Sequence, residues 1–123
     1  MKLSEKHILV TGGAGFIGSN FVSAIAKDNR VTVLDNFASS VVTLNYLNTI
    51  KNVTAIRGDI LDDKKLDSVM PGIDVVVHFA VACVRISLSR PRHTHDVNAT
   101  GTLNTLLAAK KSSSQTLHLY LIK

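Results

Sequence analysis

The sequence has one cysteine, Cys83, and only 5% aromatic residues among its 123 positions. A single cysteine excludes an intrachain disulfide and favours a reducing, intracellular setting. No apolar run approaches the roughly 18 residues that a membrane-spanning helix needs, and residues 1–6 lack the apolar stretch of a signal peptide. With 46% hydrophobic and 19% charged residues, we expect a globular cytoplasmic protein without a membrane segment.

The formal net charge is +5, and its densest stretch contains Arg85, Arg90 and Arg92. A nucleic-acid-binding chain typically has a continuous basic stripe with interleaved aromatics, and this chain has few aromatics. We therefore expect no specific nucleic-acid partner. The basic stretch can equally meet an anionic phosphate ligand.

Apolar runs alternate with helical patterns along the whole chain. The runs at 7–10, 31–34, 53–56, 73–77 and 117–122 predict strands. Helices are expected over 16–25 and 41–50, from Asp62 or Asp63 to about residue 70, and from Thr94 or His95 to Lys111, with a loop over 79–93. This order predicts an α/β fold: a Rossmann-type doubly wound parallel sheet, truncated to about five strands, with strand order 3-2-1-4-5. The length favours one domain over residues 1–123.

A glycine-rich segment, residues 11–18, joins the first strand to the first helix. Gly12 suits a tight turn, Gly15 allows the backbone to approach a pyrophosphate, and Gly18 allows close packing of the helix. The following helix would point free N–H groups at the phosphates. A bare glycine pattern also marks ordinary turns, but this one lies between a strand and a helix, as a dinucleotide site requires.

Two aspartates close the second and third strands. Asp35 stands about 20 residues after the glycine segment, where a carboxylate accepts hydrogen bonds from the adenosine ribose and repels a 2′-phosphate. NAD is thus favoured over NADP. Asp59 is positioned to reach the adenine amino group, with Ile60 packing on the ring. The alternatives are a strand-terminal turn for Asp35 and a helix-entry role for Asp59.

The fourth strand ends at His78, Phe79 and Ala80, beside the switch point where the ligand crevice of such a sheet opens. Small and apolar residues there would line the nicotinamide half of the site. We interpret His78 as a packing residue rather than a catalyst. Asn98, near the start of the long helix, either points toward the cofactor, supports the sheet or is satisfied locally.

Five motifs resemble, in the same order, those of the extended short-chain dehydrogenase/reductase family, in particular its NAD-dependent nucleotide-sugar epimerases and dehydratases. These motifs are residues 11–18, 34–36, 58–60, 78–80 and 96–102. The UDP-glucose 4-epimerase-like members look most similar, over their N-terminal part only. The resemblance implies NAD as cofactor and a binding set comprising Gly12, Gly15, Phe16, Ile17, Gly18, Asp35, Asn36, Asp59, Ile60, Phe79, Ala80, Val81 and Asn98. In that assignment Phe16 and Ile17 back onto the pyrophosphate.

The family's proton transfer uses a tyrosine with a lysine four residues later. Here Ile50 stands four residues after Tyr46, and only three residues follow Tyr120. We therefore assign no catalytic residue, and we expect no metal site. The ending has the pattern of a truncation or a diverged tail.

Three interpretations follow. The first is the NAD-binding domain of an epimerase or dehydratase, which is inactive by itself. Under this interpretation only a complete relative would bind a nucleotide sugar as substrate. The second is an active enzyme completed by another chain, and the third is a non-catalytic module that senses NAD. We expect homo-oligomers, because the resemblance places a subunit-pairing helix over residues 95–111 and a sheet ending at its fifth strand leaves an open edge.

Overall fold

Five parallel strands form one sheet in the computed structural model, which describes residues 3–112 and 118–121. Their order is β3-β2-β1-β4-β5, so the predicted order 3-2-1-4-5 is confirmed. Residues 117 and 122 of the predicted fifth strand lie outside the described residues. The strands are β1 (His7–Thr11), β2 (Arg30–Asp35), β3 (Val53–Arg57), β4 (Val75–His78) and β5 (His118–Leu121).

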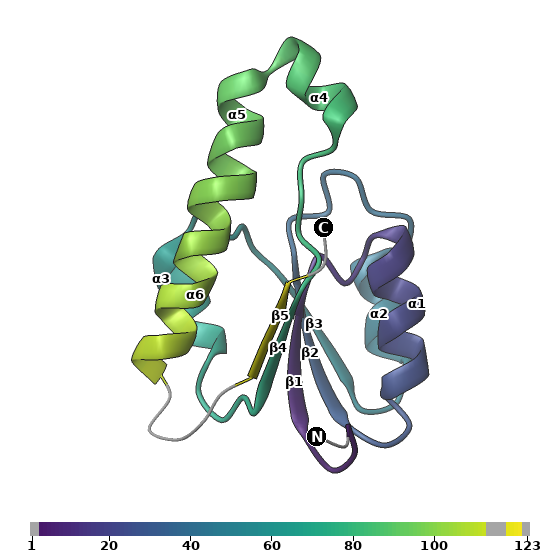
Figure 1. Ribbon diagram of the computed structural model, residues 1–123. Coiled ribbons are helices and arrows are strands. Elements are labelled where there is room, and N and C mark those ends of the chain that lie inside the picture. The colour runs from purple at the N-terminus through teal and green to yellow at the C-terminus, as the bar shows by residue number, and fades with distance from the viewer. Residues whose placement is uncertain (1–2, 113–117, 122–123) are drawn as a thin grey trace.

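Helices cover both faces of this sheet, as the doubly wound architecture requires (Figure 1). On one face lie α1 (Phe16–Ile25) and α2 (Leu44–Thr49), and on the other lie α3 (Asp63–Val69) and α6 (Gly101–Ser112). The predicted helix over 41–50 is shorter than expected because Thr43 caps it, accepting a hydrogen bond from Tyr46 N through its side chain. Asp62 caps α3 in the same way, through Lys65 N, as the sequence suggested.

The alternation of side chains along the strands divides the core into two layers. Ile8 and Val10 of β1 pack under α1 and α2, whereas Leu9 packs under α3 and α6. All four residues of β4 are buried, so this strand is covered on both faces. The sheet is therefore a rigid base for the loops at its carboxyl edge.

The prediction of a loop over residues 79–93 is wrong in its second half. Two short helices form there, α4 (Val84–Ser89) and α5 (Pro91–His95), and they project beyond the sheet (Figure 1). Neither contains a buried residue, so no apolar periodicity marks them in the sequence. The long helix begins at Pro91 rather than at Thr94 or His95. Proline suits the first turn of a helix, because that turn does not use its missing N–H.

Between α5 and α6 the helix widens into a π-helical turn, Asp96–Thr100. Turns of this kind are rare and often occur at functional sites. This one directly precedes α6, on the face of the sheet that α3 and α6 cover (Figure 1).

Candidate functional site

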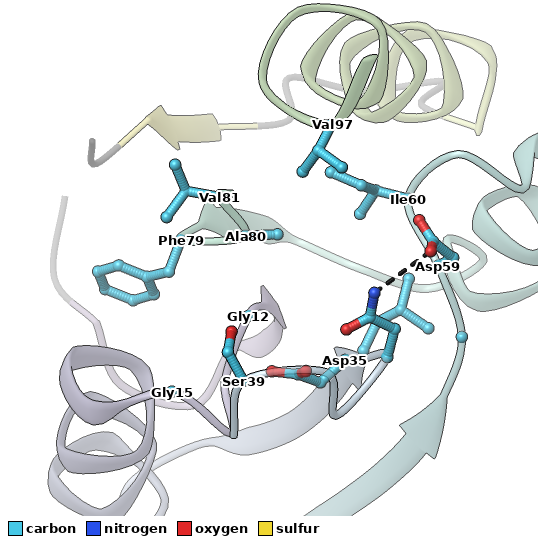
Figure 2. Close-up of a pocket in the computed structure, with 13 residues that line it drawn as sticks. Gly12, Gly15, Asp35, Ser39, Asp59, Ile60, Phe79, Ala80, Val81 and Val97 are labelled. Carbon is cyan, nitrogen blue, oxygen red and sulfur yellow. Dashed lines mark hydrogen bonds between the residues drawn. The ribbon is translucent and has the colours of Figure 1, made fainter. Parts of the chain in front are cut away.

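One pocket lies at the carboxyl edge of the sheet, where the loops after β1, β2, β3 and β4 meet (Figure 2). Nine of the thirteen residues predicted to bind the cofactor line it. The strands bring these residues together because parallel strands present their carboxyl ends at the same edge. The nine are Gly12, Gly15, Asp35, Asn36, Asp59, Ile60, Phe79, Ala80 and Val81.

The glycine-rich loop forms the floor of the pocket between β1 and α1. Gly12 has a φ of 71°, and a Cβ there would lie 2.6 Å from Ala80 N, so a side chain is excluded by both conformation and space. A Cβ at Gly18 would overlap Gly12 O, so this glycine lets α1 pack on the loop itself. Gly15 differs from both, since its φ is −74° and a Cβ would meet only Gly12 O, at 3.4 Å.

Gly13, to which the sequence pattern gave no role, is also sterically required. A Cβ at this position would lie 2.8 Å from Val33 Cγ1, inside the buried core. The loop therefore rests directly on β2. This close approach places it beside Asp35, which ends that strand.

Asp35 holds two backbone segments with its carboxylate. Oδ2 accepts a hydrogen bond from Ala14 N at 2.9 Å, and Oδ1 accepts one from Phe37 N at 2.8 Å. The second bond is the strand-terminal turn that the sequence left open as an alternative. Each carboxylate oxygen has two lone pairs, so acceptor capacity remains on the pocket side.

The loops after β2 and β3 are linked across the pocket rim. Asn36 Nδ2 donates to Asp59 Oδ2 at 3.2 Å, as the dashed line in Figure 2 shows. Asp59 Oδ1 accepts from Leu61 N at 2.9 Å in a local turn, whereas the helix-entry role that the sequence also allowed for it belongs to Asp62. Arg57 stacks over the Phe37 ring, 4.6 Å from its centroid, and thereby stiffens the same rim.

Phe79, Ala80 and Val81 form the opposite wall, on the segment that leaves β4 (Figure 2). The Phe79 ring meets the ring of Phe21 edge to face, with centroids 5.4 Å apart, so α1 anchors this wall. Val81 is half exposed. The wall is apolar, as predicted for the half of the site beyond the adenosine.

Four predicted residues do not line the pocket. Phe16 and Ile17 are exposed on the first turn of α1, and Gly18 is buried against the loop. Asn98 uses its side chain elsewhere: Oδ1 accepts from Ala82 N at 2.8 Å, and Nδ2 donates to Ala82 O at 3.0 Å. Ala82 lies 16 residues before Asn98, so this is not the local satisfaction that the sequence left open; the contact holds the segment just beyond the apolar wall.

The pocket also includes residues that sequence reasoning did not select. Ser39 follows the Asp35 turn, and Val97 reaches in from the π-helical turn. Neither belongs to a spacing rule that could have identified it. Leu34 and Gly58 line the pocket too, and both stand inside motifs that the sequence marked.

His78, the last residue of β4, is fully buried and does not line the pocket. Its Nδ1 is 2.6 Å from Thr11 Oγ1, and its Nε2 is 3.1 Å from Thr102 Oγ1. The side chain thus connects β1, β4 and α6. This arrangement matches its interpretation as a packing residue.

The site lies in a region that matches a known family. The model of the NAD dependent epimerase/dehydratase family matches residues 8–121. The chain belongs to this family. Both the glycine-rich loop and the residues of the pocket fall inside the matched range.

Curated relatives include two kinds of nucleotide-sugar enzyme. The chain is 40% identical over 115 residues to a dTDP-glucose 4,6-dehydratase of Streptomyces niveus, which covers 85% of this chain and 34% of the relative. It is 38% identical over 107 residues to a UDP-glucose 4-epimerase of Neisseria meningitidis, which covers 80% of this chain and 31% of the relative. The chain therefore spans about a third of the length of these relatives.

Solved structures of the family have the same fold. An epimerase from Methanothermobacter thermautotrophicus superposes with a TM-score of 0.83 at 35% identity, covering 90% of this chain and 33% of the other. A UDP-glucose 4-epimerase from Bifidobacterium longum, solved with NAD⁺ and UDP, gives a TM-score of 0.78 at 33% identity, covering 92% and 36%. The Rossmann-type prediction is therefore confirmed.

Among the described residues, no helix has the length and apolarity to span a membrane.

Proposed function

We propose that this chain binds NAD as the cofactor-binding region of a nucleotide-sugar epimerase or dehydratase. The observation that carries the proposal is the pocket itself. It joins a glycine-rich loop, two strand-terminal aspartates and an apolar wall at the carboxyl ends of β1 to β4. A sheet of this topology binds dinucleotides at that place.

The residues present fit a dinucleotide. Gly15 lines the pocket, and a side chain there would meet little of the protein, so the space beside it is open to a ligand. No side chain caps the N-terminus of α1, which leaves the first N–H groups of that helix available to a pyrophosphate. NAD, when bound, supplies the acceptor for a hydride.

Within this proposal each wall has its own role. Asp35 and Asn36 hold the adenosine ribose, Asp59 and Ile60 hold the adenine, and Phe79 to Val81 flank the nicotinamide ribose. The charge of Asp35 disfavours the 2′-phosphate of NADP. Phe16, Ile17 and Gly18 act through their backbone at the start of α1.

We further propose that the 123-residue chain alone turns over no sugar nucleotide. Ile50 rather than a lysine stands four residues after Tyr46, and an unperturbed tyrosine with a pKa near 10 is a poor base at neutral pH. Incubation with UDP-glucose or dTDP-glucose and NAD should yield no epimer, no dehydrated sugar and no NADH. Turnover that appears only with a second chain would favour the completed enzyme instead.

Titration calorimetry with NAD and NADP tests the binding proposal. We expect saturable binding of NAD and weaker binding of NADP. Equal or reversed affinities would contradict the role given to Asp35, and no binding of either cofactor would contradict the proposed function.

The proposal includes self-association in the cytoplasm. Leu103, Leu106 and Leu107 are exposed on α6 at helical spacing, so they form one apolar stripe. A stripe of this kind is covered when two copies of a helix pair.

The proposed location is the cytoplasm, which is a reducing compartment. The single cysteine supports it, because a lone cysteine forms no intrachain disulfide.

A further inference from the structure

The pocket has two walls that come from distant parts of the chain, and one helical segment contacts both. The apolar wall is the segment Phe79 to Val81 after β4, and the facing wall carries Ile60 after β3. The π-helical turn and the first turn of α6 pass over both, with Val97 between them (Figure 2).

Asn98 attaches this segment to the apolar wall. Its amide makes two hydrogen bonds with the backbone of one residue, Ala82, at 2.8 and 3.0 Å. A paired contact of this kind fixes both position and orientation of the Ala82 peptide, which follows directly on Val81. Ala82 is buried, so no solvent bond replaces these two without a rearrangement.

Gly101 and Asn104 attach the same segment to the facing wall. Asn104 Nδ2 donates to Ile60 O at 3.1 Å. A Cβ at Gly101 would lie 2.7 Å from Ile60 Cγ1 and would overlap its Cδ1. The side chain of Ile60 therefore occupies the space that Gly101 leaves, and its depth in the pocket depends on that glycine.

The segment is itself fixed to the sheet from below. Thr102 Oγ1 donates to Asn98 O at 2.8 Å and lies 3.1 Å from His78 Nε2. His78 Nδ1 is in turn hydrogen-bonded to Thr11 Oγ1 at 2.6 Å. A buried chain of polar contacts thus ties the π-helical turn to β4 and β1.

We propose that the segment from Val97 to Asn104 sets the distance between the two walls, which makes Asn98 and Gly101 positioning residues for the bound dinucleotide. This inference rests on the proposed function. It predicts that the two residues act on different halves of the ligand. Gly101 acts on the adenosine half through Ile60, and Asn98 acts on the half beyond the pyrophosphate through Ala82, which directly follows the apolar wall.

Calorimetric titration of NAD and ADP against the unsubstituted chain, Asn98→Ala and Gly101→Ala tests this division. Asn98→Ala should weaken NAD about tenfold and leave ADP within about twofold, because ADP lacks the nicotinamide half. Gly101→Ala should weaken both ligands by a similar factor, about tenfold, as Ile60 is pushed into the adenine side. Asn48→Ala is the matched control. Asn48 Oδ1 accepts a hydrogen bond from Ala55 N at 2.8 Å, so this variant also removes a bond between an amide side chain and the backbone, but outside the pocket.

The control should lose stability without any change in either affinity. NAD and ADP affinities that stay unchanged in both folded variants, while the unsubstituted chain binds, would overturn this inference alone. Failure of the unsubstituted chain to bind either ligand would overturn the proposed function. If Asn98→Ala does not fold, Gly101→Ala decides: it presses on the flexible end of one side chain, and an ADP affinity equal to that of the unsubstituted chain contradicts the inference.

Discussion

Asp35 Oδ2 accepts a hydrogen bond from Ala14 N at 2.9 Å, so the acidic residue expected at the ribose also holds the glycine-rich loop. The carbonyl of Ala14 in turn accepts from Val41 N at 2.9 Å. Hydrogen bonds therefore fix the loop at both the N–H and the carbonyl of Ala14, independently of a ligand. Preorganisation of this kind lowers the cost of binding.

Asp35→Asn should reduce NAD affinity and narrow the preference for NAD over NADP. The amide removes the charge that repels a 2′-phosphate, and its NH₂ group cannot accept from Ala14 N or Phe37 N, so one loop contact is lost as well. Loss of a bond to a charged group costs roughly 1.5–3 kcal/mol, about 10- to 140-fold in affinity. Calorimetry with both cofactors measures the ratio. A mutant that keeps the full NAD preference would show that Asp35 does not face the ribose.

Gly15→Ala should leave the fold intact and weaken NAD binding at least tenfold. The φ of −74° accepts alanine, and the new methyl group meets little protein, but it projects where the pocket lies. Each tenfold loss corresponds to about 1.4 kcal/mol. Thermal unfolding and calorimetry separate the two effects.

Gly72→Ala is the matched control for that variant. Its φ of 79° is unfavourable for alanine although nothing lies within 4 Å, so stability should fall by roughly 1–2 kcal/mol while NAD binding is unchanged. The opposite pattern, with Gly15→Ala binding NAD normally, would remove the pyrophosphate from this loop.

Stability should fall in mild acid because of His7. Burial, followed by the nearby Arg30, lowers the pKa of His7 below its ordinary value of about 6.5. The unfolded chain then binds this proton more readily than the folded one, so the free energy of unfolding decreases as pH drops through about 6.5 and levels off below the folded-state pKa. Urea unfolding between pH 7.5 and 5 should show a smaller decrease in His7→Gln. An identical decrease in both proteins would assign the effect to other groups.

Self-association should depend on the apolar stripe of α6. Leu107 is 54% exposed, and Leu107→Glu places a charge where a second copy would pack. We expect the unsubstituted chain to associate at tens of micromolar, where exposed apolar surfaces usually do, and the variant to be monomeric. Light scattering gives both masses. A monomeric unsubstituted chain would contradict the proposal.

Much of this fold could be predicted because its signals are local. Each strand is a short apolar run ended by a polar residue, and alternation of strands with helices determines a parallel order. The glycine spacing likewise located the pocket, since Gly12 at the tight turn and Gly18 at the helix contact each require a missing side chain.

The rest depends on contacts between distant residues. Asn98 and Ala82 are paired only because the chain between them folds into α4 and α5, which bury nothing and leave no periodic signal. Val97 likewise reaches the pocket only through the π-helical turn. A single sequence contains no pattern for such pairings.

Titration of the ¹⁵N-labelled chain with NAD, followed by backbone amide chemical shifts, tests the central claim most directly. We predict saturable shifts concentrated at Gly12, Gly15, Asp35, Ile60 and Ala80. The amino ends of the strands, at the edge of the sheet opposite the pocket, should change little. Absence of shifts at millimolar NAD, or shifts confined to residues outside the pocket, would contradict the account.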